Sequence, residues 1–140
     1  MTSRLFRYWI VAIGLTVLPI YIVGCGPKPV TGGTEGALRI DGQTVSDLQV
    51  NLFRSNGGAF ELAGFGVTRD DGWFSLVQPG AVGPLILPPG EYLCTIESAG
   101  APIRLLKEWG KPETTKIKID WKSSDRNIDL DVESQQRKAP

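Results

Sequence analysis

The chain has 140 residues, with 15 basic and 15 acidic side chains and therefore a formal net charge of zero. This length leaves room for one domain, and the balanced charge gives no electrostatic reason to expect a nucleic-acid partner. Histidine is absent, which excludes the usual general base, the commonest zinc ligand and every Ser-His or Cys-His nucleophile. The two cysteines, Cys25 and Cys94, are too few for a disulfide framework and form no C-x-x-C pair.

The first 24 residues have the pattern of an export signal. Arg4 and Arg7 precede an apolar run of 17 residues, 8–24, that ends in small residues. A basic segment followed by such a run is typical of a secretory signal peptide.

The end of this run, Ile22-Val23-Gly24-Cys25, resembles the bacterial lipobox. The resemblance implies that residues 1–24 are removed and that the Cys25 thiol carries lipid. Such lipoproteins hold two or three acyl chains, palmitate among them, and more than one chain makes anchoring stable. Gly26 follows the cysteine where aspartate is typical of inner-membrane retention. We therefore expect an outer-membrane anchor in the cell envelope, with the domain outside the cytoplasm.

Two alternatives to the lipobox are an uncleaved membrane-spanning helix and an ordinary signal peptide. The run is close to the lower limit of about 17–25 residues for crossing a bilayer. Pro19 and the helix-disfavouring residues 24–27 favour a processed segment. Residues 25–35 are rich in Gly, Pro and Thr, which predicts a flexible tether between lipid and domain.

Residues 36–133 alternate like the strands of a sheet. Apolar residues recur at every second position in seven short runs, within 38–40, 48–52, 59–68, 73–76, 92–96, 117–121 and 128–132. Such alternation buries every second side chain. A change of phase at Gly64 predicts a bulge or bend. Short links between the runs predict an all-β fold, a seven-stranded antiparallel β-sandwich, followed by a disordered tail over 134–140.

The sequence also predicts the turns and the buried residues of this sandwich. Asp71-Gly72 is the clearest hairpin signal, and residues 103–110 are compatible with one or two helical turns. The residues expected to be buried are Val50, Leu52, Phe74, Leu76, Tyr92, Ile96, Ile117, Ile119, Leu130 and Val132.

Three segments in order resemble a known family: IDGQTVSDLQVNL (40–52), GVTRDDGWFSL (66–76) and PPGEYLCTI (88–96). They are similar to the transthyretin-like, carboxypeptidase-regulatory-like β-sandwich of small bacterial lipoproteins, as are the closing segments 107–115 and 127–132. The resemblance implies the same sandwich and a non-catalytic role. A hydrolase of purine breakdown shares this topology, but its activity relies on histidines, so we expect no enzyme.

Three aspartates and one cysteine are candidates for chemistry. Asp41, Asp70 and Asp71 offer oxygen ligands in turns, as calcium prefers, but no D-x-D-x-D-G spacing is present. The alternative is that Asp71 closes a turn with a left-handed glycine. Cys94 shares a strand face with Tyr92 and is expected to be a small buried hydrophobe rather than a redox thiol. We expect no metal and no cofactor.

Three aromatic residues form a candidate binding surface: Trp73, Trp109 and Phe53. An exposed coplanar row would favour stacking on sugar rings, and packing at an edge is the alternative. Within the loop 102–113, we expect Trp109 to fold back and plug the sandwich, with outward presentation to a partner as the alternative.

The sequence thus predicts a lipid-anchored cell-envelope protein with a non-catalytic structural or binding role. Its expected partners are the membrane, through the N-terminal lipid, and an envelope protein or polysaccharide. The alternative function is a carbohydrate-binding accessory module.

Overall fold

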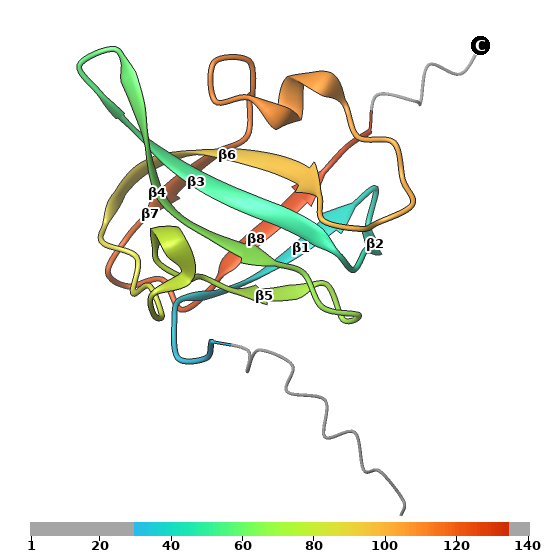
Figure 1. Ribbon diagram of the computed structural model, residues 1–140, viewed down its shortest axis with the longest axis horizontal. Helices are drawn as coiled ribbons and strands as arrows, with labels where there is room; N and C mark the ends of the chain where they lie inside the picture. The colour runs from blue at the N-terminus through green and yellow to red at the C-terminus, as the bar shows by residue number, and fades with distance from the viewer. Residues whose placement is uncertain (1–29, 135–140) are drawn as a thin grey trace, which may run out of the picture.

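The computed structural model describes residues 30–134 (Figure 1). The lipobox residues Ile22, Val23 and Gly24, the expected lipidation site Cys25 and residues 135–140 of the expected tail lie outside the described residues.

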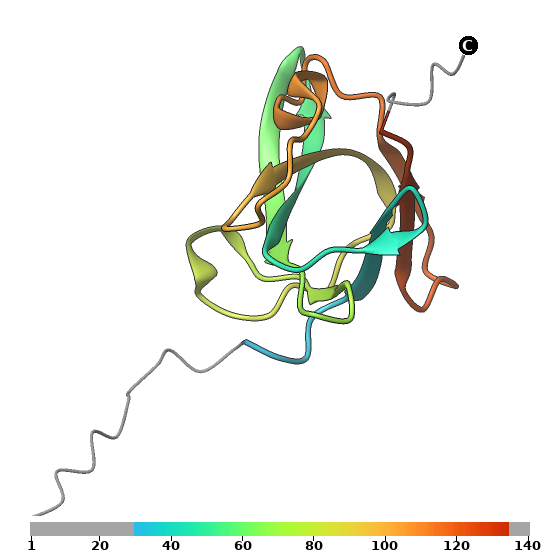
Figure 2. The same ribbon diagram turned by 90° about the vertical axis from the view of Figure 1, so that its right-hand side faces the viewer.

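Eight strands form two sheets of four strands each. One sheet contains β1 (Glu35–Ile40), β2 (Gln43–Thr44), β5 (Trp73–Ser75) and β8 (Ile128–Val132). The other has the order β4 (Ala59–Val67), β3 (Leu48–Asn56), β6 (Gly90–Ser98) and β7 (Lys118–Trp121). Two 3-10 turns, η1 (Pro79–Ala81) and η2 (Lys107–Gly110), lie in the longer connections. In Figure 2, β3 and β4 stand on one side of the core and β8 on the other. The predicted all-β sandwich is confirmed.

Two details of strand pairing differ from the prediction. The short strand β2 adds an eighth strand, because two of its residues pair with the end of β1. The sandwich is also not wholly antiparallel, since β8 pairs with β1 in parallel from Gly36↔Ile128 to Ile40↔Val132. A parallel neighbour cannot be reached by a tight hairpin. Here the chain reaches β8 from β7 of the opposite sheet, through the link 122–127.

The hairpin predicted at Asp71-Gly72 forms in part: the tight turn closes, and beyond it Phe65 of β4 pairs antiparallel with Val77, just after β5. The Arg69 N–H donates to the Trp73 carbonyl at 2.8 Å, and Gly72 has a left-handed φ of 77°. However, the strands on either side of this turn belong to different sheets. The chain therefore uses this turn to pass from one sheet to the other, and the pairing of its two arms is limited to an isolated bridge, Phe65↔Val77, instead of a full ladder between β4 and β5.

Two hairpins of the described chain have two-residue loops: Asp41-Gly42 joins β1 to β2, and Gly57-Gly58 joins β3 to β4. In the second, Asn56 pairs with Ala59 across the loop. The φ angles are 60° at Gly57 and 89° at Gly58. Two successive positive φ values are what a hairpin of this length requires, and glycine adopts them without steric cost.

The irregularity expected near Gly64 is confirmed. Leu52 pairs with Gly64 and Phe53 pairs with Leu62, so Ala63 is the additional residue of a β-bulge. Glycine is also required here by close packing: a Cβ at Gly64 would stand 2.3 Å from Leu85 Cδ2 and 2.7 Å from the Val77 carbonyl oxygen.

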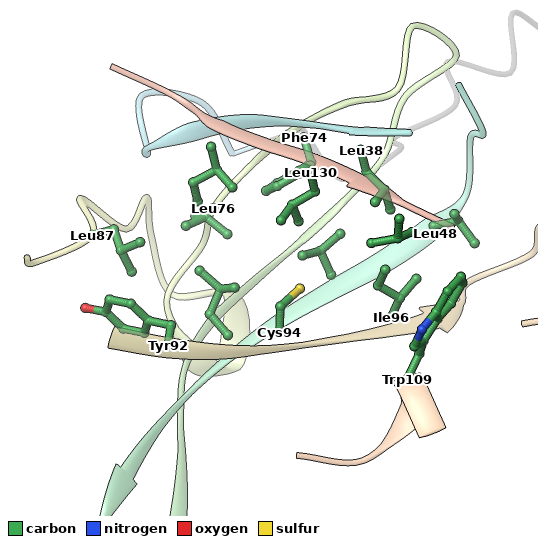
Figure 3. Close-up of a cluster of buried hydrophobic side chains, with 14 of the residues drawn as sticks. Leu38, Leu48, Phe74, Leu76, Leu87, Tyr92, Cys94, Ile96, Trp109 and Leu130 are labelled. Atoms are coloured by element: carbon green, nitrogen blue, oxygen red, sulfur yellow. The ribbon is translucent and has the colours of Figure 1, made fainter. Parts of the chain in front are cut away.

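The core lies between the sheets (Figure 3). Eight of the ten residues expected there are buried, whereas Ile117, just before the edge strand β7, and Ile119, within it, are half-buried. The register is therefore confirmed, because a slip of one residue would have exposed all of them. The eight are Val50, Leu52, Phe74, Leu76, Tyr92, Ile96, Leu130 and Val132.

Candidate functional site

An open groove of about 650 Å³ lies at the end of the sandwich where the chain enters the domain. This size falls within the range of about 300–1,000 Å³ that is usual for small-ligand sites. We call it the entry groove. It is lined by residues 33–35, 73, 86–89, 121–123 and 125–127.

Thr34 holds the entering chain to the link between β5 and β6. Its backbone N–H donates to the Leu85 carbonyl at 2.8 Å, and its carbonyl accepts from the Leu76 N–H at 2.9 Å. Its side-chain Oγ1 accepts from the Leu87 N–H at 2.9 Å. Because all three bonds reach one link, they fix one wall of the entry groove relative to the first strand.

The opposite wall depends on Trp121, at the end of β7. Its indole N–H donates to the Leu87 carbonyl at 2.8 Å, and the side chain is buried. Beyond it, the Lys122 N–H donates to Asp125 Oδ2 at 2.8 Å, and the Asp125 N–H donates back to the Lys122 carbonyl at 3.0 Å. This turn brings the polar residues 125–127 to the rim.

Trp73 contributes the aromatic surface of the entry groove. It lies on β5 and is half-buried, and its backbone N–H donates to Asp71 Oδ1 at 3.0 Å. The charged residues on the lining are Glu35, Lys122, Asp125 and Arg126. An indole face beside two acidic and two basic groups can stack on a ring and exchange hydrogen bonds with its substituents.

The three aromatic residues expected to form a binding surface are not brought together. Trp109 is only 5% exposed. Phe53 is half-buried on β3, where it pairs with Leu93 and Leu62, whereas Trp73 belongs to the other sheet. The exposed coplanar row that would have favoured sugar binding is therefore not formed, and Trp73 is the member that lines the entry groove.

The loop that carries Trp109 folds back onto the sandwich, as predicted. The 3-10 turn η2 lies against β6, and the indole ring stands beside Ile96 (Figure 3). The backbone N–H of Trp109 donates to the Leu106 carbonyl at 3.0 Å, which closes the turn. Since Trp109 belongs to the hydrophobic core, its role as a plug is confirmed, and its outward presentation to a partner is excluded.

Two of the three candidate calcium ligands, Asp71 and Asp41, accept hydrogen bonds in separate places, and the third, Asp70, is exposed. Asp71 accepts from the Trp73 N–H, and Gly72 beside it is left-handed, as the turn interpretation predicts. Asp41 accepts from the backbone N–H of Ser134 at 3.0 Å and from its hydroxyl. Within residues 30–134, no three Asp, Glu, His or Cys side chains gather into a group able to hold a metal ion.

Cys94 is fully buried between the sheets, on the face that it shares with Tyr92 and Ile96. Burial disfavours the thiolate and raises the pKa of this thiol from 9.0 to about 12. The interpretation of Cys94 as a small buried hydrophobe is confirmed.

The polar residues of the entry groove were missed by sequence reasoning. Asn127, Arg126 and Lys122 occur in an ordinary polar turn, far in sequence from Trp73. They meet Trp73 only because the link 122–127 crosses between the sheets, and no local pattern reports such a crossing. No protein-family model, curated protein or solved structure matches the chain.

Proposed function

We propose that this chain is a lipid-anchored protein of the cell envelope, whose β-sandwich has a non-catalytic structural or binding role. The observation that carries the proposal is Cys25, which follows Ile22-Val23-Gly24 directly at the end of the apolar run. The first strand begins at Glu35, only ten positions later. Gly26 favours the outer membrane. Among residues 30–134, no helix has the length and apolarity needed to cross a bilayer.

The test is an intact-mass measurement on the protein extracted from membranes. The expected mass corresponds to a chain beginning at Cys25 with two or three acyl chains added. Cys25→Ser should move the protein out of the membrane fraction. Cys94→Ala is the matched control, because it removes the other cysteine and should leave the protein in the membrane. A mature protein that still contains residues 1–24 would contradict the proposal.

A second candidate function is a carbohydrate-binding accessory module. Trp73 favours it, because its ring lines a groove with polar and charged groups. A row with Trp109 and Phe53, which would have favoured it further, is not formed, so this candidate depends on Trp73 alone among the three aromatic residues.

A further inference from the structure

Two aliphatic side chains project from the entry end of the sandwich with little cover. Val82 is 77% exposed and Ile86 is 69% exposed, whereas Val67 and Ile103 reach only 40% and 36%. Val82 and Ile86 both belong to the link between β5 and β6. We call this pair the aliphatic tip.

The aliphatic tip is held close to the point where the chain enters the domain. Thr34 makes its hydrogen bonds to Leu85 and Leu87, the two residues that flank Ile86. In Figures 1 and 2, the yellow-green turn η1 that precedes Val82 lies at the same end of the molecule as the blue entering segment. The tip and the tether therefore share one end of the sandwich.

The length of the tether limits how far this end can lie from the lipid. Thr34 is nine positions after Cys25, and nine residues span at most about 32 Å even when fully extended. The opposite end is further away by the length of β6, whose nine residues extend about 30 Å. An anchor at Cys25 therefore keeps Thr34, beside the aliphatic tip, within about 32 Å of the lipid, and the entry end is the end of the domain that lies nearest to the anchor along the chain.

We propose that Val82 and Ile86 insert into the lipid bilayer that holds the anchor, so that the entry end of the sandwich lies on the membrane. The inference rests on the proposed lipidation of Cys25. The lining of the entry groove fits this position, because the half-buried Trp73 is of the residue type enriched at membrane–water interfaces. The two acidic and two basic side chains on the same lining give it no net charge. Apolar contact, rather than attraction to anionic lipid, is therefore expected to dominate.

The experiment places an environment-sensitive nitrobenzoxadiazole fluorophore on an introduced cysteine in the full lipidated protein. Ile86→Cys reports on the tip. Ile103→Cys is the matched control, because Ile103 is also an exposed isoleucine but follows the far end of β6. Each labelled protein is reconstituted into vesicles of phosphatidylcholine alone, or of phosphatidylethanolamine with phosphatidylglycerol. Emission is then measured with nitroxide-bearing lipid or with aqueous iodide as quencher. Buried Cys94 should take up no label, which the protein without an introduced cysteine verifies.

The expected result is a shift of the Ile86 emission to shorter wavelength, with quenching by nitroxide lipid and protection from iodide, in both kinds of vesicle. The Ile103 probe should stay accessible to iodide. An Ile86 probe that remains in water overturns the proposal. So does one that is shielded from iodide but not quenched by lipid, since a second copy or another protein then covers the tip. A shift confined to anionic vesicles overturns the dominance of apolar contact.

The two proposals fail in distinguishable ways. The mass of each labelled protein is measured before reconstitution. A chain without acyl groups at Cys25 contradicts the proposed function. An acylated chain whose Ile86 probe stays in water contradicts only the insertion of the aliphatic tip.

Discussion

Arg54 on β3 and Tyr92 on the neighbouring strand β6 are joined by both a hydrogen bond and a cation–π contact. Arg54 Nη2 donates to the Tyr92 hydroxyl at 2.6 Å, and the guanidinium lies 4.9 Å from the centroid of the tyrosine ring. The same hydroxyl donates to the Pro88 carbonyl at 2.6 Å. Because Pro88 lines the entry groove, this pair connects the central strand β3 to the groove wall.

Tyr92→Phe removes the hydroxyl and keeps the ring in the core. We expect the free energy of unfolding to fall by about 1–3 kcal/mol, the usual range for losing hydrogen bonds of which one involves a charged group. Urea denaturation of the variant measures the loss. Glu91→Gln, at the exposed neighbouring position, is the control and should change stability by less than about 0.5 kcal/mol. Equal stability of Tyr92→Phe and the parent would show that the two bonds contribute nothing net.

Gly64→Ala tests the close approach of the β5–β6 link to β4. The new methyl group would meet Leu85 Cδ2 at 2.3 Å and the Val77 carbonyl oxygen at 2.7 Å. Relieving these contacts requires a shift of backbone, so we expect a loss of about 1–3 kcal/mol, as is typical for overpacked sites. Gly110→Ala is the matched control, since no packed neighbour lies within 4 Å of the position that its new methyl group would take. Similar melting temperatures for the two variants would contradict the close approach at Gly64.

The fold was predictable to the extent that it depends on local alternation. In strands β3, β6 and β8 the apolar side chains at every second position are buried, so the core residues Val50, Ile96 and Leu130 could be assigned before their partners were known. The burial of the polar Asn51 and Thr95 between such positions could not be assigned in this way. Pairing depends on long-range packing instead. The turn at Asp71-Gly72 has the composition of a hairpin turn, yet it joins two sheets.

The candidate site was much less predictable than the fold. Trp73 could be singled out because large aromatic residues outside the core pattern are conspicuous. Arg126 and Asn127 carry no such signal, and their proximity to Trp73 depends on the crossing from β7 to β8. The exposure of Val82 and Ile86 was also missed, because an apolar residue in a loop is as compatible with packing as with projection into solvent.

The titration of Cys94 should make stability depend on alkaline pH. Because its pKa is raised from 9.0 to about 12, folded and unfolded chains both hold a neutral thiol below pH 9. Between pH 9 and about 12 the unfolded chain loses the proton first, so stability falls by up to about 1.4 kcal/mol per pH unit. The measured quantity is the difference in the free energy of unfolding between the parent and Cys94→Ala in urea denaturation, because every other group is common to both proteins. This difference should shrink as the pH rises from 9. A constant difference would contradict the raised pKa.

The last prediction separates the two tryptophans that sequence reasoning grouped together. Trp109→Ala removes a buried plug and should cost about 3–5 kcal/mol, the usual range for truncating a large core aromatic. Trp73→Ala removes a half-buried ring at the rim of the entry groove, and its cost should stay below about 2 kcal/mol.

Thermal melts compare the stabilities of the two variants, and retention on an immobilised cell-wall polysaccharide gives a second readout. If the chain is a carbohydrate-binding module, Trp73→Ala abolishes retention while the domain still melts cooperatively, because aromatic side chains dominate such contacts. Retention by the parent and by Trp73→Ala alike would remove the entry groove as the sugar site. A Trp109→Ala domain as stable as the parent would contradict the role of Trp109 as a plug of the sandwich.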